Sequence, residues 1–375
     1  MTDCSFFYNE IKALGVDFFA GVPDSLLKDI CAYIADQSPD GTHHITANEG
    51  GAVALASGYH LATGKAALVY MQNSGQGNAI NPILSLADPD VYSIPMLLLI
   101  GWRGEPGVKD EPQHLKQGKV TLQLLDTLGI PYEVMPQTND QLSGTLQSLT
   151  EKMYHESRPV ALVVKDSSFT PYKLAAGVQN SSTLSREEAI KYIVDASQGS
   201  DIFVSTTGKT SRELYEYRDQ KKQSHAQDFL TVGSMGHSSH IALGIALQKK
   251  TIQVFCLDGD GAALMHMGSM AVNAAASPKN LKHIILNNCA HDSVGGQPTV
   301  ASNLSFTEIA RGCGYRWAAT ATDVNQLTVL LQQLRQTEGP ALLEVMVRPG
   351  ARTDLGRPKT SPQENKAAFM DFLRL

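Results

Sequence analysis

The chain has 375 residues, of which 42% are hydrophobic and 18% charged, so a disordered or fibrous protein is excluded and about two or three globular domains are expected. The net charge of −6 leaves no broad basic field for nucleic acid or an anionic membrane. No apolar run reaches the roughly 18 residues that span a bilayer, and the five cysteines show no C-x-x-C spacing. These features predict a cytoplasmic protein with no nucleic-acid or membrane partner.

Short apolar runs alternate with amphipathic stretches along the first half of the chain. Strands are predicted at Phe18–Val22, His44–Thr46, Ala66–Met71, Met96–Ile100, Tyr132–Met135 and Val160–Val164. Helices are predicted between them, among them Ser25–Ile34, Gly50–Ala62, Asn78–Ala87 and Gln117–Leu128. Buried strands that alternate with helices are typical of parallel sheets built from right-handed β-α-β units.

The same alternation restarts after a small, polar segment at Pro171–Ser185, which has the composition of a domain boundary. Strands are predicted at Ile202–Ser205, Phe229–Val232, Gln253–Leu257, His283–Leu286, Trp317–Ala319 and Ala341–Val347, with helices at 185–197, 237–248, 261–276 and 324–336. The sequence therefore predicts an α/β protein of two doubly wound parallel-sheet domains, residues 1–175 and 185–375.

Two short polar motifs follow neighbouring strands of the predicted second domain. Gly259, Asp260, Gly261 and Ala262 open a helix, where backbone N–H groups attract an anion and the glycines let it approach closely. Asp260 and Asn288 are 28 residues apart, about one strand–helix–strand unit, so both should reach the carboxyl edge of the sheet. A carboxylate and an amide oxygen suit a hard cation. The pattern predicts magnesium bridging a diphosphate.

Gly-Asp-Gly followed further along by Asn-Asn resembles the cofactor motif of the thiamine-diphosphate-dependent enzymes. The resemblance implies thiamine diphosphate and Mg²⁺ as cofactors, with Asp260, Asn288 and the carbonyl of Ala290 as metal ligands. It implies the family's fold, with a pyrimidine-binding first domain, a diphosphate- and magnesium-binding second domain and no middle domain. It also implies a homo-oligomer with active sites between subunits.

The same resemblance assigns further cofactor contacts. Glu49, at a strand end and a helix start, would hydrogen-bond the ring nitrogen of the aminopyrimidine and favour its imino tautomer. Met235, in the Gly233–Gly236 turn, would support the bend of the cofactor, with the Gly233 carbonyl accepting from the aminopyrimidine. The remaining contacts would come from Thr207, Gly208 and Ser234.

Five segments look closest to the phosphonopyruvate decarboxylases, at residues 19–25, 71–78, 101–107, 110–114 and 288–297. The sulfopyruvate decarboxylases are close relatives with a similar pattern, often divided into two subunits. The resemblance implies non-oxidative decarboxylation of 3-phosphonopyruvate to phosphonoacetaldehyde and CO₂, in phosphonate biosynthesis. Sulfopyruvate, or another 2-oxo acid taken by a thiamine-diphosphate decarboxylase or carboligase, is the alternative.

A small anionic 2-oxo acid needs local cations and a proton source. The predicted substrate-binding residues are Ser25, Gln76, Arg103, Lys109, Arg352 and Arg357, with His114 and Lys116 as further cationic candidates. Arginine binds tetrahedral oxyanions through two parallel hydrogen bonds. The proton that replaces the lost carboxylate could come from Asp24, His114 or His291, and the sequence does not choose among them.

Two other classes of protein lack support in the sequence. A nicotinamide-dependent dehydrogenase requires G-x-G-x-x-G after an early strand, and Gly75-Gln-Gly77 lacks the third glycine. A catalytically silent binding protein has no need of Glu49, Met235, Asp260 and Asn288 together. Both classes are disfavoured.

Overall fold

A computed structural model describes residues 1–175, 177–178 and 180–374. The backbone forms two compact units: unit 1 comprises Met1–Gly177 with Val294–Gln297, and unit 2 comprises Val178–Ser293 with Pro298–Leu375. Ala176, Gln179 and Leu375 lie outside the described residues, so the predicted seam and the end of the second domain are described only in part. The assignment of residues 1–175 and 185–375 to pyrimidine and diphosphate binding stays a prediction.

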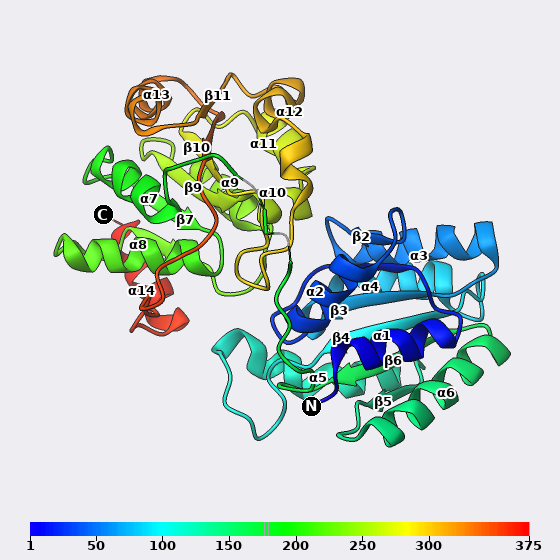
Figure 1. Cartoon of the computed structure of the whole chain (residues 1–375). Helices are drawn as coiled ribbons and strands as arrows, with labels where there is room; N and C mark the ends of the chain where they lie inside the picture. The colour runs from blue at the N-terminus through cyan, green and yellow to red at the C-terminus, as the bar shows by residue number, and fades with distance from the viewer. Residues whose placement is uncertain (176, 179, 375) are drawn as a thin grey trace. The chain divides into compact units, whose positions relative to one another are not determined.

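Unit 1 contains one six-stranded parallel sheet in the order β2-β1-β3-β4-β6-β5 (Figure 1). The strands are β1 Phe19–Gly21, β2 His43–Ile45, β3 Ala67–Gln72, β4 Met96–Gly101, β5 Tyr132–Val134 and β6 Pro159–Val164. The chain leaves β1 toward β2 on one side and returns to β3 on the other. This topological switch point is where open α/β sheets bind ligands, outside the carboxyl ends of the strands.

Helices cover both faces of this sheet. They are α1 Cys4–Ala13, α2 Lys28–Gln37, α3 Glu49–Thr63, α4 Gln76–Pro82, α5 Pro112–Thr127 and α6 Asn139–His155, with short turns η1 Asn73–Gly75 and η2 Ile83–Ala87. Leu68 and Tyr70 of β3 join a core with α1, α2 and α6. Val69 and Met71 of the same strand join a second core with α3, α4 and α5. Alternate side chains of a strand point to opposite faces, so β3 is buried on both.

Unit 2 repeats the architecture of a sheet with flanking helices (Figure 1). Its strand order is β11-β12-β10-β9-β7-β8. Its strands are β7 Ile202–Ser205, β8 Asp228–Leu230, β9 Val254–Gly259, β10 Leu281–Asn287, β11 Trp317–Ala321 and β12 Ala341–Met346. The described pairs are parallel, and the switch point lies between β7 and β9. The predicted diphosphate residues follow these two strands, Thr207 after β7 and Asp260 after β9.

The helices of unit 2 are α7 Arg186–Asp195, α8 Lys209–Gln220, α9 Ser238–Gln248, α10 Asp260–Met265, α11 Ser269–Ala276, α12 Phe306–Cys313, α13 Val324–Gln336 and α14 Pro362–Phe372, with the turn η3 Val300–Asn303. Helix α7 begins with a capping box, in which Ser185 and Glu188 satisfy each other's backbone N–H groups. α7, α8 and α13 share one core with the sheet. The other helices pack in two further cores.

The predicted fold class is confirmed: two doubly wound parallel sheets, and no third compact unit within the described residues. The single helix predicted at 261–276 is wrong, because the backbone breaks at His266 (φ −133°, ψ 50°) and divides it into α10 and α11. Two other helices begin at residues that differ from the prediction. The helix predicted from Ser25 begins later, at Lys28, as α2. The helix predicted from Gln117 begins earlier, at Pro112, as α5.

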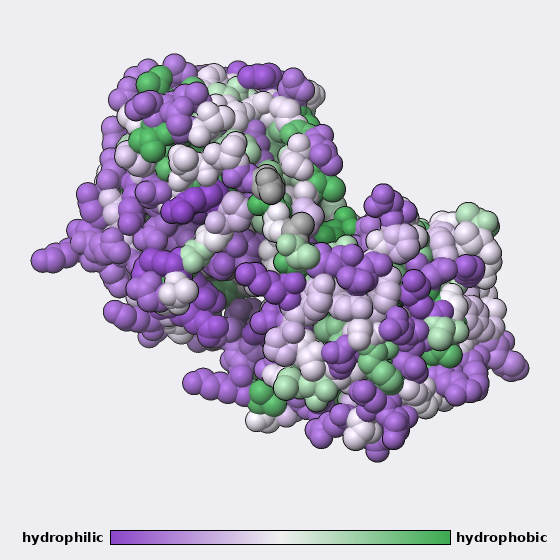
Figure 2. Space-filling model, viewed as in Figure 1, coloured by the Kyte–Doolittle hydropathy of each residue, from purple (hydrophilic) through white to green (hydrophobic). Residues whose placement is uncertain are grey.

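Most of the face in view in Figure 2 is covered by hydrophilic residues, and hydrophobic residues appear there mainly singly or in small groups. In the part of the chain that the structure describes, no helix combines the length and apolar character needed to cross a membrane.

Candidate functional site

Glu49 is the first residue of α3, and Thr46–Asn48 separate it from the carboxyl end of β2. The side chain of Asn48 caps the helix by accepting from the Gly51 N–H, at 2.9 Å. The Glu49 side chain is 5% exposed, and its Oε2 accepts from Asn78 Nδ2 at 2.7 Å. Burial raises the pKa of the Glu49 carboxyl, and the hydrogen bond from Asn78 opposes this shift. The site therefore holds a carboxyl group whose protonated form is favoured by burial.

Asp24 lies at the switch point of unit 1, after β1. It is 1% exposed, and its two carboxylate oxygens accept from Gln72 Nε2 at 2.5 Å and from the Leu26 N–H at 3.0 Å. Burial raises the pKa of Asp24, although the Gln72 hydrogen bond and the charge of Arg103 act against it. Asp24 is therefore the second buried carboxyl at this edge of the sheet.

Arg103 follows β4 and is bound both by its own loop and by the loop after β1. Its Nε donates to Asp110 Oδ2 at 2.8 Å, its Nη2 donates to Asp110 Oδ1, and its Nη1 donates to Ser25 Oγ at 2.8 Å. The hydrogen bond to Asp110 raises the pKa of Arg103. The predicted substrate residues Ser25 and Arg103 are thus in contact, beside Asp24.

The other predicted residues of unit 1 differ in how far they are buried. Gln76 begins α4 and is 4% exposed, whereas Lys109 and Lys116 are exposed. His114 is half-buried in the first turn of α5, and its Nδ1 has no partner among the described residues. Burial, followed by the charge of Arg103, lowers the pKa of His114.

In unit 2, Asp260 begins α10 and is 3% exposed. Thr299 Oγ1 donates to its Oδ2 at 2.5 Å, and the backbone N–H groups of Asn288 and Gly261 lie near enough to the carboxyl group to lower its pKa. Burial raises the pKa of Asp260 to about 6, and the opposing influences are all hydrogen bonds. The structure therefore brings Asp260 and Asn288 close together, with no cationic side chain among those influences.

The turn after β10 holds Asn288, the second predicted metal ligand. Asn288 Oδ1 accepts from the Ala290 N–H at 3.0 Å, and Cys289 between them has a left-handed φ of 58°. Ala290 forms an isolated bridge with Pro298, and the Thr299 N–H donates to the Cys289 carbonyl at 2.9 Å. Thr299 thus ties this turn to Asp260.

Three predicted residues converge on the start of α10. A Cβ placed on Gly261 would lie 3.4 Å from the His291 ring and 3.4 Å from Met235 Cε, so both side chains border this glycine. Burial lowers the pKa of His291 to about 4. Met235 sits in a turn in which Gly233, Ser234 and Gly236 have φ of 67°, 47° and 87°. Such a turn favours glycine, since other residues rarely adopt positive φ.

Thr207 links the β7 end to that turn, because its Oγ1 accepts from the Gly233 N–H at 2.9 Å. Gly208, with φ 95°, precedes α8. Gly259 caps α10, and Ala262 is buried in it. The predicted cofactor residues of unit 2 therefore lie at one sheet edge, on both sides of the switch point.

The two tail arginines have other partners. Arg352 Nε donates to Glu187 at 3.1 Å, Nη1 lies 3.1 Å from Asp354, and Nη2 pairs with Glu216. Arg357 also interacts with the chain. The structure thus places Arg352 against α7 and α8, and its predicted contact with substrate stays a prediction.

The residues of unit 2 suit a divalent cation and a diphosphate. Asp260, Asn288 and the Ala290 carbonyl offer hard oxygen donors, and a cation would supply the positive charge that the buried Asp260 lacks. The Thr206 hydroxyl, 4% exposed and directly before Thr207, has no partner within the described residues, so a donor is available for a bound anion.

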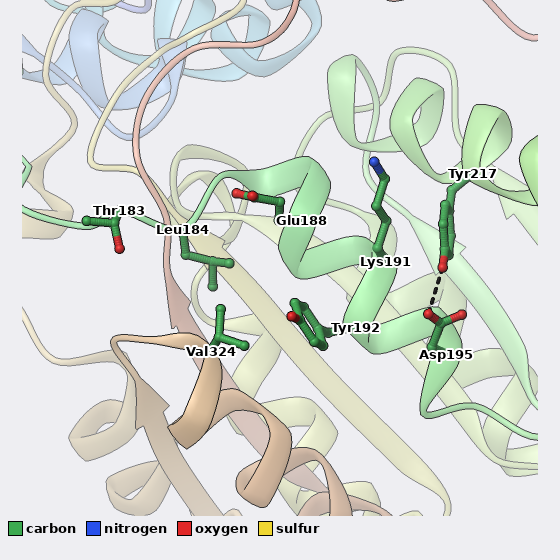
Figure 3. Close-up of a pocket in the computed structure, with 8 residues that line it drawn as sticks. All are labelled: Thr183, Leu184, Glu188, Lys191, Tyr192, Asp195, Tyr217 and Val324. Atoms are coloured by element: carbon green, nitrogen blue, oxygen red, sulfur yellow. Dashed lines mark hydrogen bonds between the residues drawn. The ribbon is translucent and has the colours of Figure 1, made fainter.

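Two other features of unit 2 are formed by residues outside the predicted site. Cys256, Asp258 and His283 are buried with ligand atoms within 4.8 Å of one another, but sulfur and imidazole donors suit softer metals than Mg²⁺. A cavity of about 490 Å³ borders α7 and includes Tyr217, which donates to Asp195 at 2.7 Å (Figure 3). None of the predicted site residues lines that cavity.

Sequence reasoning missed several side chains that hold the predicted ones. They are Gln72, Asn78, Asp110 and Thr299. Gln72, Asn78 and Asp110 lie in segments that carry the family resemblance, and that resemblance could have identified them. Thr299 follows Asp260 by 39 residues, and only the fold brings them together.

Two family models match the chain. Residues 4–127 match the thiamine pyrophosphate enzyme N-terminal TPP-binding domain, and residues 206–345 match the corresponding C-terminal TPP-binding domain. The matched ranges include Glu49 in the first case and Asp260 and Asn288 in the second.

Curated relatives resemble nearly the whole chain. The phosphonopyruvate decarboxylase of Streptomyces viridochromogenes is 35% identical over 97% of this chain and 93% of its own. That of Streptomyces hygroscopicus is 35% identical over 96% of this chain and 92% of its own. The sulfopyruvate decarboxylase of Methanosarcina acetivorans is 29% identical over 97% of this chain and 95% of its own. The chain therefore belongs to the thiamine-pyrophosphate-dependent decarboxylases, in the family of the phosphonopyruvate decarboxylases.

Proposed function

We propose that this enzyme decarboxylates 3-phosphonopyruvate to phosphonoacetaldehyde and CO₂, as a step of phosphonate biosynthesis in the cytoplasm. The observation that carries the proposal is the 35% identity to two phosphonopyruvate decarboxylases along almost the full length of each chain. Sulfopyruvate is the alternative substrate, because a sulfopyruvate decarboxylase is 29% identical over 97% of this chain.

Unit 1 has the candidate residue for the aminopyrimidine half of the cofactor, and unit 2 has the candidate residues for the diphosphate half. When bound, thiamine diphosphate supplies a carbanion that adds to the substrate carbonyl and a ring that accepts the electron pair left by CO₂. Asp260, Asn288 and the Ala290 carbonyl would hold Mg²⁺ against the diphosphate. Glu49 would hydrogen-bond the aminopyrimidine nitrogen, and its raised pKa helps it to keep a proton there.

Asp24 is the best supported proton donor. Burial favours the protonated form of a carboxylic acid but disfavours that of an imidazole. Accordingly, the pKa of Asp24 is raised, whereas those of His114 and His291 are lowered. Of the three candidates, Asp24 is therefore the one whose protonated form is favoured by burial, and it is proposed to deliver the proton that replaces the lost carboxylate.

The phosphonate needs at least one cationic partner. Arg103 supports this role because its guanidinium contacts Ser25 and lies close enough to Asp24 for the two charges to interact. Its ion pair with Asp110 fixes the guanidinium in place. Lys109, Arg352 and Arg357 remain proposed contacts of the same anion.

We also propose that the enzyme is a homo-oligomer with active sites shared between subunits. Helix α3 is apolar on more than one side: Ala52, Val53 and Ala56 are buried, while Leu55 and Leu61 are 37% and 76% exposed. A helix that is hydrophobic all round is normally covered. A second copy of the chain would bury these leucines.

A substrate comparison tests the proposal. The purified enzyme with thiamine diphosphate and Mg²⁺ is assayed for kcat/KM with phosphonopyruvate, sulfopyruvate and pyruvate. We expect phosphonopyruvate to give the highest value. A much higher kcat/KM for sulfopyruvate would replace the proposed substrate by the alternative and leave the reaction class unchanged.

A further inference from the structure

Asp292, two residues after the proposed metal ligand Ala290, receives four hydrogen bonds or ion-pair contacts. Its Oδ2 lies 3.1 Å from Arg186 Nη1 and 3.2 Å from Lys209 Nζ, and its Oδ1 accepts from the Gly350 N–H at 3.1 Å. The Asp292 main-chain carbonyl accepts from Lys209 Nζ at 3.0 Å. The side chain is 15% exposed. One residue of this turn is therefore bound from several directions.

The partners belong to three separate segments of unit 2. Arg186 is the first residue of α7, Lys209 is the first residue of α8, and Gly350 follows β12. Arg186 also makes two hydrogen bonds of 2.8 Å to Glu213 of α8, so it bridges this helix and Asp292. The contacts bind the segment after β10 to the starts of both helices.

The start of α8 directly follows a proposed wall of the diphosphate site. Gly208 precedes Lys209, and a Cβ placed on Gly208 would lie 3.5 Å from Ser293 Oγ. The segment His291–Ser293 therefore packs on Gly208 as well as being bound by Lys209. The proposed metal ligands and the proposed diphosphate wall are joined through Asp292.

We propose that Asp292 is a positioning residue, which fixes the spacing between the metal-binding turn Asn288–Ala290 and the diphosphate wall Thr207–Gly208. This inference rests on the proposed assignment of both segments to the cofactor. Asp292 acts through Lys209, Arg186 and the backbone of its own turn, and needs no contact with the cofactor.

Charge and position predict opposite results when Asp292 loses its charge. Asp292→Asn leaves Arg186 and Lys209 less neutralised, so the electrostatic effect alone would strengthen binding of an anionic diphosphate. If Asp292 positions the site, the substitution would instead weaken diphosphate binding, because the metal-binding turn and the diphosphate wall would no longer be held at a fixed spacing. The direction of the change in cofactor affinity therefore separates the two explanations.

The experiment measures the Kd of thiamine diphosphate at saturating Mg²⁺ by calorimetry with the full chain. Asp201→Asn is the matched control: Asp201 also pairs with an arginine, Arg335, and accepts a backbone N–H, from Gln198 at 2.7 Å. Asp201→Asn removes the same charge, but Asp201 lies before β7, at the amino end of the strand. We expect Asp292→Asn to raise the Kd roughly tenfold or more, as for residues that orient metal ligands, and Asp201→Asn to leave it within about twofold.

Amide hydrogen exchange in the cofactor-free protein gives a second readout. Exchange at residues 289–293 should be faster in Asp292→Asn than in wild type and unchanged in Asp201→Asn. If Asp292→Asn does not fold, Lys209→Gln removes two of the four contacts and should produce the same local increase. Unchanged exchange, or a Kd equal to or below that of wild type in Asp292→Asn, would overturn the inference. A wild-type protein that fails to bind the cofactor would overturn the proposed cofactor assignment itself.

Discussion

At the scale of single residues, Glu49 combines a functional position with a cost in stability. Burial raises its pKa above the ordinary 4.5 of a glutamic acid, so the folded chain binds this proton more tightly than the unfolded chain. Stability is therefore lost as pH rises from that ordinary value through the raised pKa of the folded state. Glutamine keeps an oxygen that can accept from Asn78 but has no charge to bury.

Glu49→Gln should therefore release CO₂ at least about 100-fold more slowly than wild type, the usual scale for loss of an acid–base group. In the cofactor-free protein its Tm should match that of wild type near pH 4 and exceed it once pH has risen through the raised pKa of folded Glu49. Thermal scans across this range and a CO₂ assay measure both effects. Undiminished CO₂ release would show that Glu49 has no role in the reaction.

Asp24 gives a second residue-scale prediction. If Asp24 donates the proton, the rate should fall as pH rises through its raised pKa, because the acid is then ionised. Asp24→Asn should slow aldehyde formation by at least about 100-fold and abolish this alkaline fall. A pH profile of kcat for both proteins tests the assignment. An alkaline fall that persists in Asp24→Asn would assign the titrating group elsewhere.

The sequence predicted the residue types of the site better than their partners. Asp260 and Asn288 follow consecutive strands, so topology alone brings them to one edge, and in the structure they lie close together. Arg103 was predicted as a cation for the substrate, but its ion pair with Asp110 depends on how one loop folds. The contacts of Arg352 with Glu187 and Glu216 likewise depend on tertiary packing that spacing does not encode.

At the scale of elements, the turn η1 packs against the start of α3. A Cβ on Gly75 would collide with the Glu49 carboxyl group, although Gly75 itself has φ −75° and ψ −15°, which any residue adopts. Gly75→Ala should therefore displace the Glu49 carboxyl and lower kcat/KM at least about tenfold, the scale expected for a misplaced catalytic group. Enzyme assays and thermal scans measure the effect.

Gly77→Ala is the control for this prediction. Gly77 lies two residues further on, in α4, and a Cβ there meets nothing within 4 Å. Alanine favours a helix over glycine by up to about 1 kcal/mol, so the Tm should stay the same or rise and kcat/KM should not change. Equal kcat/KM for the two variants would contradict the proposed role of the η1 contact.

Strands were easier to predict than helices for a physical reason. In a doubly wound fold the strands are buried on both faces and appear as apolar runs, which the sequence shows directly. Helix α8 is mostly polar, KTSRELYEYRDQ, and was missed. The break between α10 and α11 lies where Gly236 approaches His266, a contact between segments far apart in the sequence.

At the scale of the whole molecule, shared active sites can be tested by mixing inactive variants. Glu49→Gln disables the first half of a site and Asp260→Ala the second. If each site combines the two halves from different subunits, exchange between the two variants should restore about a quarter of wild-type activity in a dimer, because half of the dimers are mixed and one of their two sites is intact. Sites formed within one chain would restore none.

The reaction itself provides the most direct test. Purified enzyme is incubated with phosphonopyruvate, with and without thiamine diphosphate and Mg²⁺, while CO₂ and phosphonoacetaldehyde are quantified together. We predict one CO₂ released for each aldehyde formed, a requirement for both cofactors, and loss of turnover in Glu49→Gln and Asp260→Ala. Turnover that needs neither cofactor, or persists in both variants, would contradict the account.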